Sequence, residues 1–204
     1  MPCDDMMETQ RPSSPAVEKY PAVPRLAVCG GESVRSSRCI LFDWGNTLMR
    51  DFPEFSGPMI GWPRVEPVEH VPNVLADLHK TWMLALATNA VDSNEEEIWA
   101  ALARVKLNPF LDRVYCFRKI GHKKPSPEFF GYILNDLGLD RSSVFMVGDD
   151  FDTDVIGAIR CGIRAVWYNE QSTEVRKAEM YQTIHDLRSL PETLNTLGRG
   201  RVFQ

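Results

Sequence analysis

The feature of this sequence that most constrains its fold is a regular alternation of short apolar runs with segments of helical periodicity. Parallel strands need long crossover connections, usually helices, and strands covered on both faces are apolar along their whole length. The alternation therefore predicts an α/β domain, a three-layer parallel sheet of Rossmann-like type with helices on both faces. The expected strands are residues 39–42, 83–87, 114–117, 144–147 and 165–168, and the expected helices are 71–80, 93–105, 126–138, 154–160 and 184–197.

Local signals place several helix ends. Ser93 followed by Glu96 is typical of a capping box at the start of a helix. Ser126 and Pro127 are expected to begin another helix, which Gly138 ends. Pro191 is expected to break the last helical segment.

Composition along the chain predicts one folded core with two tails. Residues 1–36 hold five prolines and no sustained apolar period, so we expect a flexible N-terminal arm with a short docked strand at 26–29. The core is expected to cover 37–198, followed by a tail at 199–204. Within the core, the proline-rich and aromatic segment 50–71 is either a short ordered flap over the site or a surface loop whose aromatic side chains pack on the core.

Charge and cysteine usage exclude several classes of protein. A formal net charge of −5 gives no general attraction to nucleic acid or to an anionic membrane. No apolar run is long enough to cross a bilayer, and the first residues do not form a secretory leader. The five cysteines are scattered, with Cys39 and Cys116 as small core residues inside strands. We therefore expect a cytoplasmic protein.

Polar residues follow three of the predicted strands, and another group lies in a loop. In parallel sheets, ligands bind beyond the carboxyl ends of the strands. Each group alone is typical of a turn or a helix cap, but their coincidence at one edge of a sheet favours a functional site. The groups are Asp43 to Thr47 after the first strand, Thr88 and Asn89 after the second, Asp149, Asp150, Asp152 and Asp154 after the fourth, and Lys123 and Lys124 in the loop 121–125.

This combination suits phosphoryl transfer. Carboxylates that converge repel one another and raise each other's pKa values, and Mg²⁺ with its preference for oxygen ligands relieves the repulsion. Asp43 could then attack phosphorus, while Thr88 and the backbone amides of 44–47 bind the phosphoryl oxygens. Lys124 would offset the charge that develops during the transfer.

The four polar segments resemble, in order and position, the four signature motifs of the haloacid dehalogenase-like superfamily. The resemblance covers roughly residues 37–197 and is nearest to small phosphatase-like members with a minimal cap or none. It implies a Mg²⁺ cofactor and leaves Asp154 with two roles, either helping to hold the metal or orienting the lysine. The implied site residues are Asp43 and Lys124 for catalysis, Trp44, Asn46, Thr47, Thr88 and Asn89 for phosphate binding, and Asp43, the Gly45 carbonyl, Asp149 and Asp154 for the metal.

The sequence departs from the family at Gly45. Phosphatases of the family have a second aspartate at this position, which protonates the leaving group and then activates water. Without it we expect slow turnover, because a positioned acid or base contributes roughly 10²–10⁴-fold in rate, and we expect Gly45→Asp to raise the rate. Asp51, His70 and His122 are candidate substitutes that the sequence cannot place within reach.

Three functions follow from these residues. The leading one is a Mg²⁺-dependent phosphohydrolase that acts on phosphate monoesters through an aspartyl-phosphate, and the alternative is a catalytically weak or inactive binding or regulatory protein. Cleavage of carbon–halogen or carbon–phosphorus bonds ranks last, because Asp149 and Asp154 are kept and no cap lysine is present. The intervals between the motifs are too short for a cap domain. We therefore expect an open site that takes a bulky phosphorylated substrate or is closed by a second subunit of a homo-oligomer.

Overall fold

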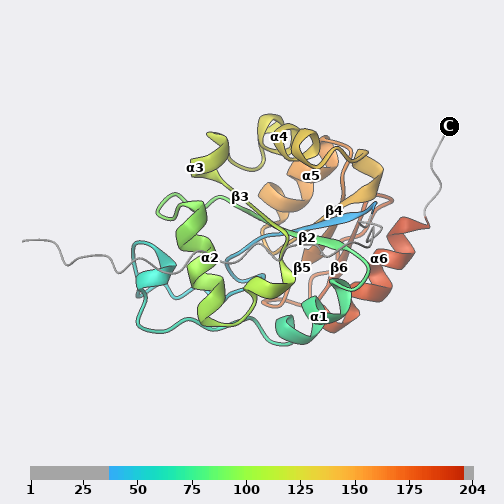
Figure 1. The fold of residues 1–204 in the computed structure, drawn as a ribbon. Helices are drawn as coiled ribbons and strands as arrows, with labels where there is room; N and C mark the ends of the chain where they lie inside the picture. Colours follow the sequence, from blue (N-terminus) through green and yellow to red (C-terminus); the bar gives the residue numbers. More distant parts are fainter. Residues whose placement is uncertain (1–36, 200–204) are drawn as a thin grey trace, which may run out of the picture. The chain divides into compact units, whose positions relative to one another are not determined.

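The computed structural model describes residues 37–199 (Figure 1). The predicted N-terminal arm, its docked strand and the residues after Arg199 lie outside this range. None of the helices within 37–199 has both the length and the apolar character needed to cross a lipid bilayer.

The described residues form a six-stranded sheet with the strand order β3-β2-β1-β4-β5-β6. All five strand pairings are parallel. The strands are β1 Cys39–Phe42, β2 Met83–Thr88, β3 Arg113–Cys116, β4 Val144–Gly148, β5 Arg164–Tyr168 and β6 Tyr181–Ile184. The first five agree with the predicted runs to within one residue at each end. The sixth was not predicted, because only Ile184 of this edge strand is buried and its sequence has no apolar run.

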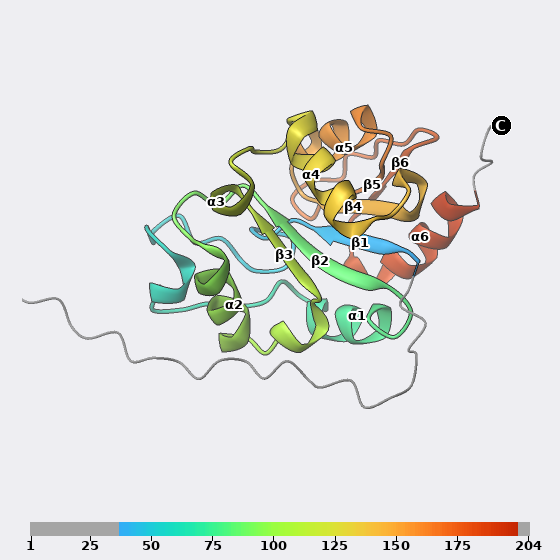
Figure 2. The same cartoon turned by 45° about the horizontal axis from the view of Figure 1, so that its top comes forward.

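Helices cover both faces of the sheet, which confirms the predicted three-layer architecture (Figures 1 and 2). Buried side chains of α1, α2 and α6 form one core with the sheet, and those of α4 and α5 form the other. Figure 1 shows α4 and α5 above the sheet and α1 and α6 below it. The helices are α1 Val71–Leu78, α2 Glu95–Arg104, α3 Phe117–Ile120, α4 Pro127–Leu137, α5 Gly157–Arg160 and α6 Leu190–Gly198.

Strand β1 shows why its sequence is apolar at every position. Successive side chains of a strand point to opposite faces. Ile40 and Phe42 join the core beneath α1, α2 and α6, whereas Cys39 and Leu41 join the core beneath α4 and α5. All four side chains are fully or almost fully buried, and burial of each large one contributes about 1.5–3 kcal/mol.

The helix ends agree in part with the predictions. Ser126 accepts a hydrogen bond from the N–H of Phe129 at the start of α4, and Gly138 ends that helix in the left-handed conformation, as expected. The predicted position of the capping box of α2 is wrong by one residue, since Asn94 and Glu97 form it and not Ser93 and Glu96. Asn94 adopts the extended conformation that a capping residue needs.

Two predicted helices also differ from the structure. A π-helical turn, Phe151–Ile156, precedes α5 where one helix was expected over 154–160. The predicted segment 184–197 is divided between the end of β6, a short 3-10 turn and α6. Pro191 does not break α6 but lies in its first turn, where its missing N–H would have no helical partner.

The segment 50–71 is tied to α2. Its rings of Phe52, Phe55 and Trp62 contact one another with centroids 5.7–6.4 Å apart. The guanidinium group of Arg104 in α2 donates hydrogen bonds to the carbonyls of Ile60 and Trp62, at 2.9 and 2.7 Å. The segment is therefore held in place by side-chain packing and by hydrogen bonds to its backbone.

The strand register brings the predicted polar groups to one place. The strand order reverses direction at β1, so the crevice between β1 and β4 is the expected position of a ligand. Phe42 pairs with both Leu86 of β2 and Val147 of β4. Asp43, the next residue, donates its N–H to the carbonyl of Val147 at 2.8 Å.

Candidate active site

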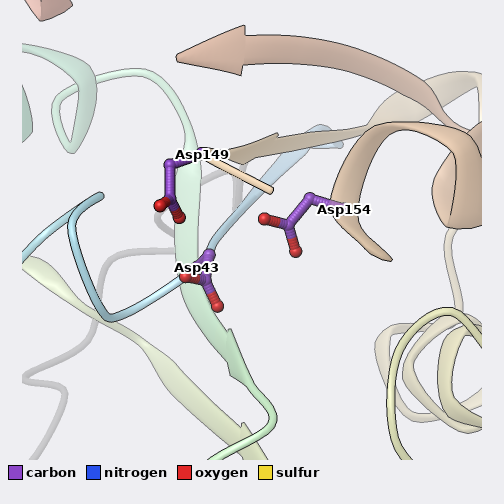
Figure 3. A group of neighbouring side chains, drawn as sticks. All are labelled: Asp43, Asp149 and Asp154. Carbon is purple, nitrogen blue, oxygen red and sulfur yellow. The ribbon is translucent and has the colours of Figure 1, made fainter. Parts of the chain in front are cut away.

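Three carboxylates converge at the carboxyl edge of the sheet (Figure 3). Asp43 follows β1, Asp149 follows β4, and Asp154 lies in the π-helical turn after β4. One carboxylate oxygen from each lies within 4.8 Å of the others. The structure therefore brings together the three acidic residues that were expected to hold the metal.

The backbone around Gly148 determines where Asp154 lies. Asp150 caps the π-helical turn by accepting hydrogen bonds from the N–H groups of Asp152 and Thr153. The turn folds Asp154 back against β4, where a Cβ atom on Gly148 would lie only 2.0 Å from Asp154 Oδ2. A side chain at position 148 is therefore incompatible with the observed position of Asp154.

Lys124 is the cation among these carboxylates. Its ammonium group lies 2.6 Å from Asp43 Oδ1 and 2.7 Å from Asp154 Oδ1, and 2% of its side chain is exposed. The Asn89 side chain holds the main chain of Lys124, accepting from its N–H at 2.7 Å and donating to its carbonyl at 2.9 Å. Asn89 was predicted to contact phosphate, but both of its polar atoms bind Lys124 here.

Burial and mutual repulsion perturb the ionisation of these groups. Burial, followed by the charge of Asp43, raises the pKa of Asp149 to about 6. Burial also raises the pKa of Asp154, against the opposing effect of the Lys124 ammonium group and with a further rise from Asp43. Burial lowers the pKa of the Lys124 ammonium group. The carboxylates of Asp154 and Asp43 outweigh this effect, so the pKa of Lys124 is raised above the ordinary value. One ammonium group therefore leaves the cluster with excess negative charge at neutral pH.

The donor set fits Mg²⁺. Hard divalent cations take oxygen ligands, and a cation here would offset both the burial and the Asp43 repulsion that raise the pKa of Asp149. Asp43 and Asp149 supply suitable oxygen donors. Asp154 is less available, because one of its oxygens accepts from Lys124 and the other from the N–H of Asp150 at 3.2 Å.

A cleft of about 500 Å³ opens onto these groups. Asp43, Thr88 and Lys124 lie in its wall, and Met59 and Trp62 of the segment 50–71 form another part of it. The segment packs on the core and also lines the cleft, and a flap over the site stays a prediction.

The side chains of Thr47 and Trp44, which were also predicted to bind phosphate, form hydrogen bonds with other side chains of the protein. Thr47 is fully buried, donates to Asp149 Oδ1 at 3.3 Å and does not line the cleft. The indole N–H of Trp44 donates to Met49 Sδ at 3.1 Å, so this side chain stabilises the turn after β1. Thr88 is almost buried but lines the cleft, as a phosphate-binding hydroxyl requires.

Asp51 is one of the three candidate substitutes for the missing aspartate whose position could not be predicted from the sequence. It lines the cleft, and its carboxylate lies beside Gly45. The residue as a whole is exposed, but partial burial of its carboxylate, followed by the charge of Asp43, raises its pKa above the ordinary value. His70 and His122, the other two candidates, do not line the cleft. No local pattern marked Asp51, because its position depends on how the turn after β1 folds back.

Comparison with known proteins identifies the class. The sequence pattern of the haloacid dehalogenase-like hydrolases matches residues 54–168, more than half of the chain. A crystal structure of an uncharacterised protein from Listeria monocytogenes serotype 4b superimposes with a TM-score of 0.69 at 25% identity, covering 78% of this chain and 98% of that one. The chain belongs to the haloacid dehalogenase-like hydrolase family.

Curated relatives of the chain are phosphatases. Glyceraldehyde 3-phosphate phosphatase of Methanothermobacter thermautotrophicus is 26% identical over 64% of this chain and 59% of the relative. Human N-acylneuraminate-9-phosphatase is 33% identical over 50% of this chain and 40% of the relative. The chain therefore spans about half the length of these two relatives. The family match begins after Asp43 and Gly45, so the first motif rests on the geometry described above.

Proposed function

We propose that this protein is a Mg²⁺-dependent phosphohydrolase that acts on phosphate monoesters through an aspartyl-phosphate at Asp43. The observation that carries the proposal is the position of Asp43, which lies in the cleft wall, bound to Lys124 and clustered with Asp149. The phosphatase names of the relatives support the same reaction class.

The proposed reaction has two displacements at phosphorus. A carboxylate oxygen of Asp43 attacks phosphorus, and the bond from phosphorus to the ester oxygen breaks, so that the leaving alcohol takes up a proton. Water then attacks the phosphorus of phospho-Asp43, loses a proton, and breaks the bond to the aspartate, which releases inorganic phosphate. Lys124 holds Asp43 in position and offsets the negative charge that develops on the phosphoryl oxygens.

The remaining residues of the site bind the phosphoryl group and orient Lys124. Thr88, Trp44 and Gly45 line the cleft, and we propose that the Thr88 hydroxyl and the backbone amides of Trp44 and Gly45 hold the phosphoryl oxygens. Asn89 positions Lys124 through its main chain, and Asp154 orients the ammonium group. Mg²⁺, held by Asp43, Asp149 and the Gly45 carbonyl, would supply positive charge to the phosphoryl group when bound.

The missing side chain at Gly45 would affect turnover rather than binding. Gly45 has no side chain to transfer a proton, so turnover would be slower by about 10²–10⁴-fold if no other group did so. This feature supports the alternative function, a weakly active or inactive binding or regulatory protein. Thermal stabilisation by Mg²⁺ with no phosphorylated Asp43 would favour that alternative.

We also propose the partners that were expected from the sequence. The cleft is wide enough at about 500 Å³ for a phosphorylated substrate larger than a phosphate group. Closure of the site by a second subunit of a homo-oligomer stays a proposal. A cytoplasmic location is also a proposal and rests on the scattered cysteines of the sequence.

An activated aryl phosphate such as p-nitrophenyl phosphate tests the proposed function. The protein should release nitrophenolate with Mg²⁺ and not with excess EDTA, and Asp43→Asn should abolish the release. Asp77→Asn, which changes an exposed carboxylate of α1, is the matched control and should keep the full rate. Turnover that survives in Asp43→Asn would contradict the role of Asp43, and mass spectrometry of the acid-quenched protein should locate the phosphoryl group on this residue.

A further inference from the structure

The side-chain space beside Gly45 contains the carboxylate of Asp51. A Cβ atom on Gly45 would lie 2.8 Å from Asp51 Oδ2 and 3.2 Å from its carboxyl carbon. Both residues line the same cleft as Asp43. A carboxylate is therefore present where Gly45 provides none, and it comes from a residue further along the chain.

The turn after β1 explains how Asp51 reaches this position. The N–H groups of Leu48 and Met49 both donate to the carbonyl of Trp44, at 3.0 and 2.9 Å, which folds the chain back on itself. Asn46, at a φ of 51°, accepts a hydrogen bond from the N–H of Asp51 at 3.2 Å through its side-chain oxygen. The Asn46 side chain thus closes the turn that carries Asp51, while its predicted part in phosphate binding stays a prediction.

Contacts of the preceding residue, Arg50, also hold the turn. The N–H of Arg50 donates to the carbonyl of Glu66 at 2.9 Å, and its guanidinium group forms a two-pronged ion pair with Glu170 in the loop after β5. These contacts, with the hydrogen bond from the Asp51 N–H to Asn46, hold the backbone that leads into Asp51. Its carboxylate is thereby directed to Gly45 by the backbone of a packed turn.

We propose that Asp51 is the general acid and base of the reaction, in place of the side chain that Gly45 lacks. This inference rests on the proposed phosphohydrolase function. In the first displacement the protonated Asp51 carboxyl gives its proton to the ester oxygen as the bond to phosphorus breaks and phospho-Asp43 forms. In the second, the Asp51 carboxylate accepts a proton from the water that attacks phospho-Asp43, which releases phosphate and restores the starting protonation state.

The proposal changes two expectations from the sequence. Turnover need not be slow, because a carboxylate is present beside position 45. Gly45→Asp alone should not raise the rate, because its Cβ atom would approach Asp51 Oδ2 to 2.8 Å and push this carboxylate aside. The backbone at Gly45 itself accepts a side chain, since its φ is outside the left-handed region.

Leaving-group dependence tests the proposal. Asp51→Asn should lower kcat/KM for an alkyl phosphate about 10²–10⁴-fold, because an alkoxide leaves poorly without a proton. With p-nitrophenyl phosphate, whose leaving group needs no proton, the variant should give a stoichiometric burst of nitrophenolate and then accumulate phospho-Asp43. Glu54→Gln, an exposed carboxylate in the same segment, is the matched control and should behave as the wild type.

Moving the carboxylate provides a second test. The double variant Gly45→Asp/Asp51→Asn should recover alkyl phosphate turnover at least tenfold over Asp51→Asn, because a carboxylate again occupies this part of the cleft. A thermal unfolding midpoint for Asp51→Asn equal to that of the wild type would show that lost activity is not lost folding.

The possible failures are distinguishable. If wild type and Asp51→Asn have the same rates with both substrates, the role of Asp51 is wrong while the phosphohydrolase function stands. If Asp51→Asn loses activity equally with both substrates and shows no burst, its role as acid and base is likewise wrong. If even the wild type forms no phospho-Asp43 and releases no phosphate, both proposals are overturned.

Discussion

The ammonium group of Lys124 lies 2.7 Å from Oδ1 of Asp154, with only 2% and 1% of the two side chains exposed. Removal of one partner from a buried ion pair leaves the other charge without compensation, which is far more costly than loss of a surface pair. The pair connects the loop before α4 to the turn after β4, and its contribution to stability can be measured separately from activity.

Lys124→Met should lower the free energy of unfolding by about 3–5 kcal/mol. Lys80→Met is the matched control, because Lys80 pairs with Asp77 at 2.7 Å but both side chains are at least 70% exposed. The control should change the free energy by less than about 1 kcal/mol. Urea unfolding at pH 7 provides the comparison, and equal losses in the two variants would show that burial of Lys124 has no energetic effect.

Gly148→Ala adds a single methyl group, but it should disrupt the site. The added Cβ atom would lie 2.0 Å from Asp154 Oδ2, so Asp154 must leave its position beside Lys124. We expect a destabilisation of about 1–3 kcal/mol and loss of phosphatase activity. Gly131→Ala in α4 is the control: nothing lies within 4 Å of its Cβ position, and alanine should stabilise the helix by up to about 1 kcal/mol. Thermal and urea unfolding of both variants, with activity assays, measure these effects.

Addition of Mg²⁺ should raise the thermal unfolding midpoint of the wild-type protein. A cation that binds only the folded state stabilises it by about 2.7 kcal/mol at a concentration one hundred times its Kd. Asp149→Asn should remove most of this stabilisation, whereas Asp152→Asn, an exposed neighbour outside the cleft wall, should keep it. Calorimetric scans with and without MgCl₂ make the comparison, and an unchanged response in Asp149→Asn would contradict its assignment as a ligand.

Arg104→Met should loosen the part of the cleft wall formed by Met59 and Trp62. The Arg104 guanidinium group donates to the carbonyls of Ile60 and Trp62, and each hydrogen bond from a charged group is worth about 1.5–3 kcal/mol. Hydrogen exchange of the backbone at 57–62 should become faster, with little change in the strands. Arg160→Met, an exposed arginine of α5, should leave the exchange unchanged.

Cys39 should resist alkylation while the protein is folded. Burial, followed by the charge of Asp112, raises the pKa of its thiol to about 12, so at pH 8 only about 10⁻⁴ of the thiol is ionised and reactive. Cys116 is also buried and should resist as well. Peptide mapping after iodoacetamide treatment at pH 8, in buffer and in urea, should show modification of both residues only in urea.

Much of the fold can be predicted from local patterns in this sequence. The strands β1, β2 and β4 are apolar at nearly every position, because each is buried on both faces, and their runs were predicted almost to the residue. Strand β6 was missed because an edge strand with one buried side chain lacks such a run. The start of α2 was displaced by one residue because Ser93 and Asn94 both suit a cap, and backbone geometry selects Asn94.

The candidate site was predictable only as a set of residue types. Convergence of Asp43 and Asp149 follows from the strand order, since the carboxyl ends of neighbouring parallel strands share one edge, whereas Lys124 reaches them from the loop before α4. The roles of Asn89 and Thr47 were not predictable, because whether a polar side chain contacts substrate or a neighbouring residue depends on orientation.

The apolar runs and the motif residues at their ends are properties of the chain itself, since burial and strand direction impose them on local sequence. The approach of Asp51 to Gly45 is not encoded in a local pattern of this type. It arises from hydrogen bonds of the turn after β1 and from contacts to Glu66 and Glu170, residues distant along the chain. Interactions between distant segments leave no periodic pattern, and for this reason only the folded protein reveals which carboxylate lies at that position.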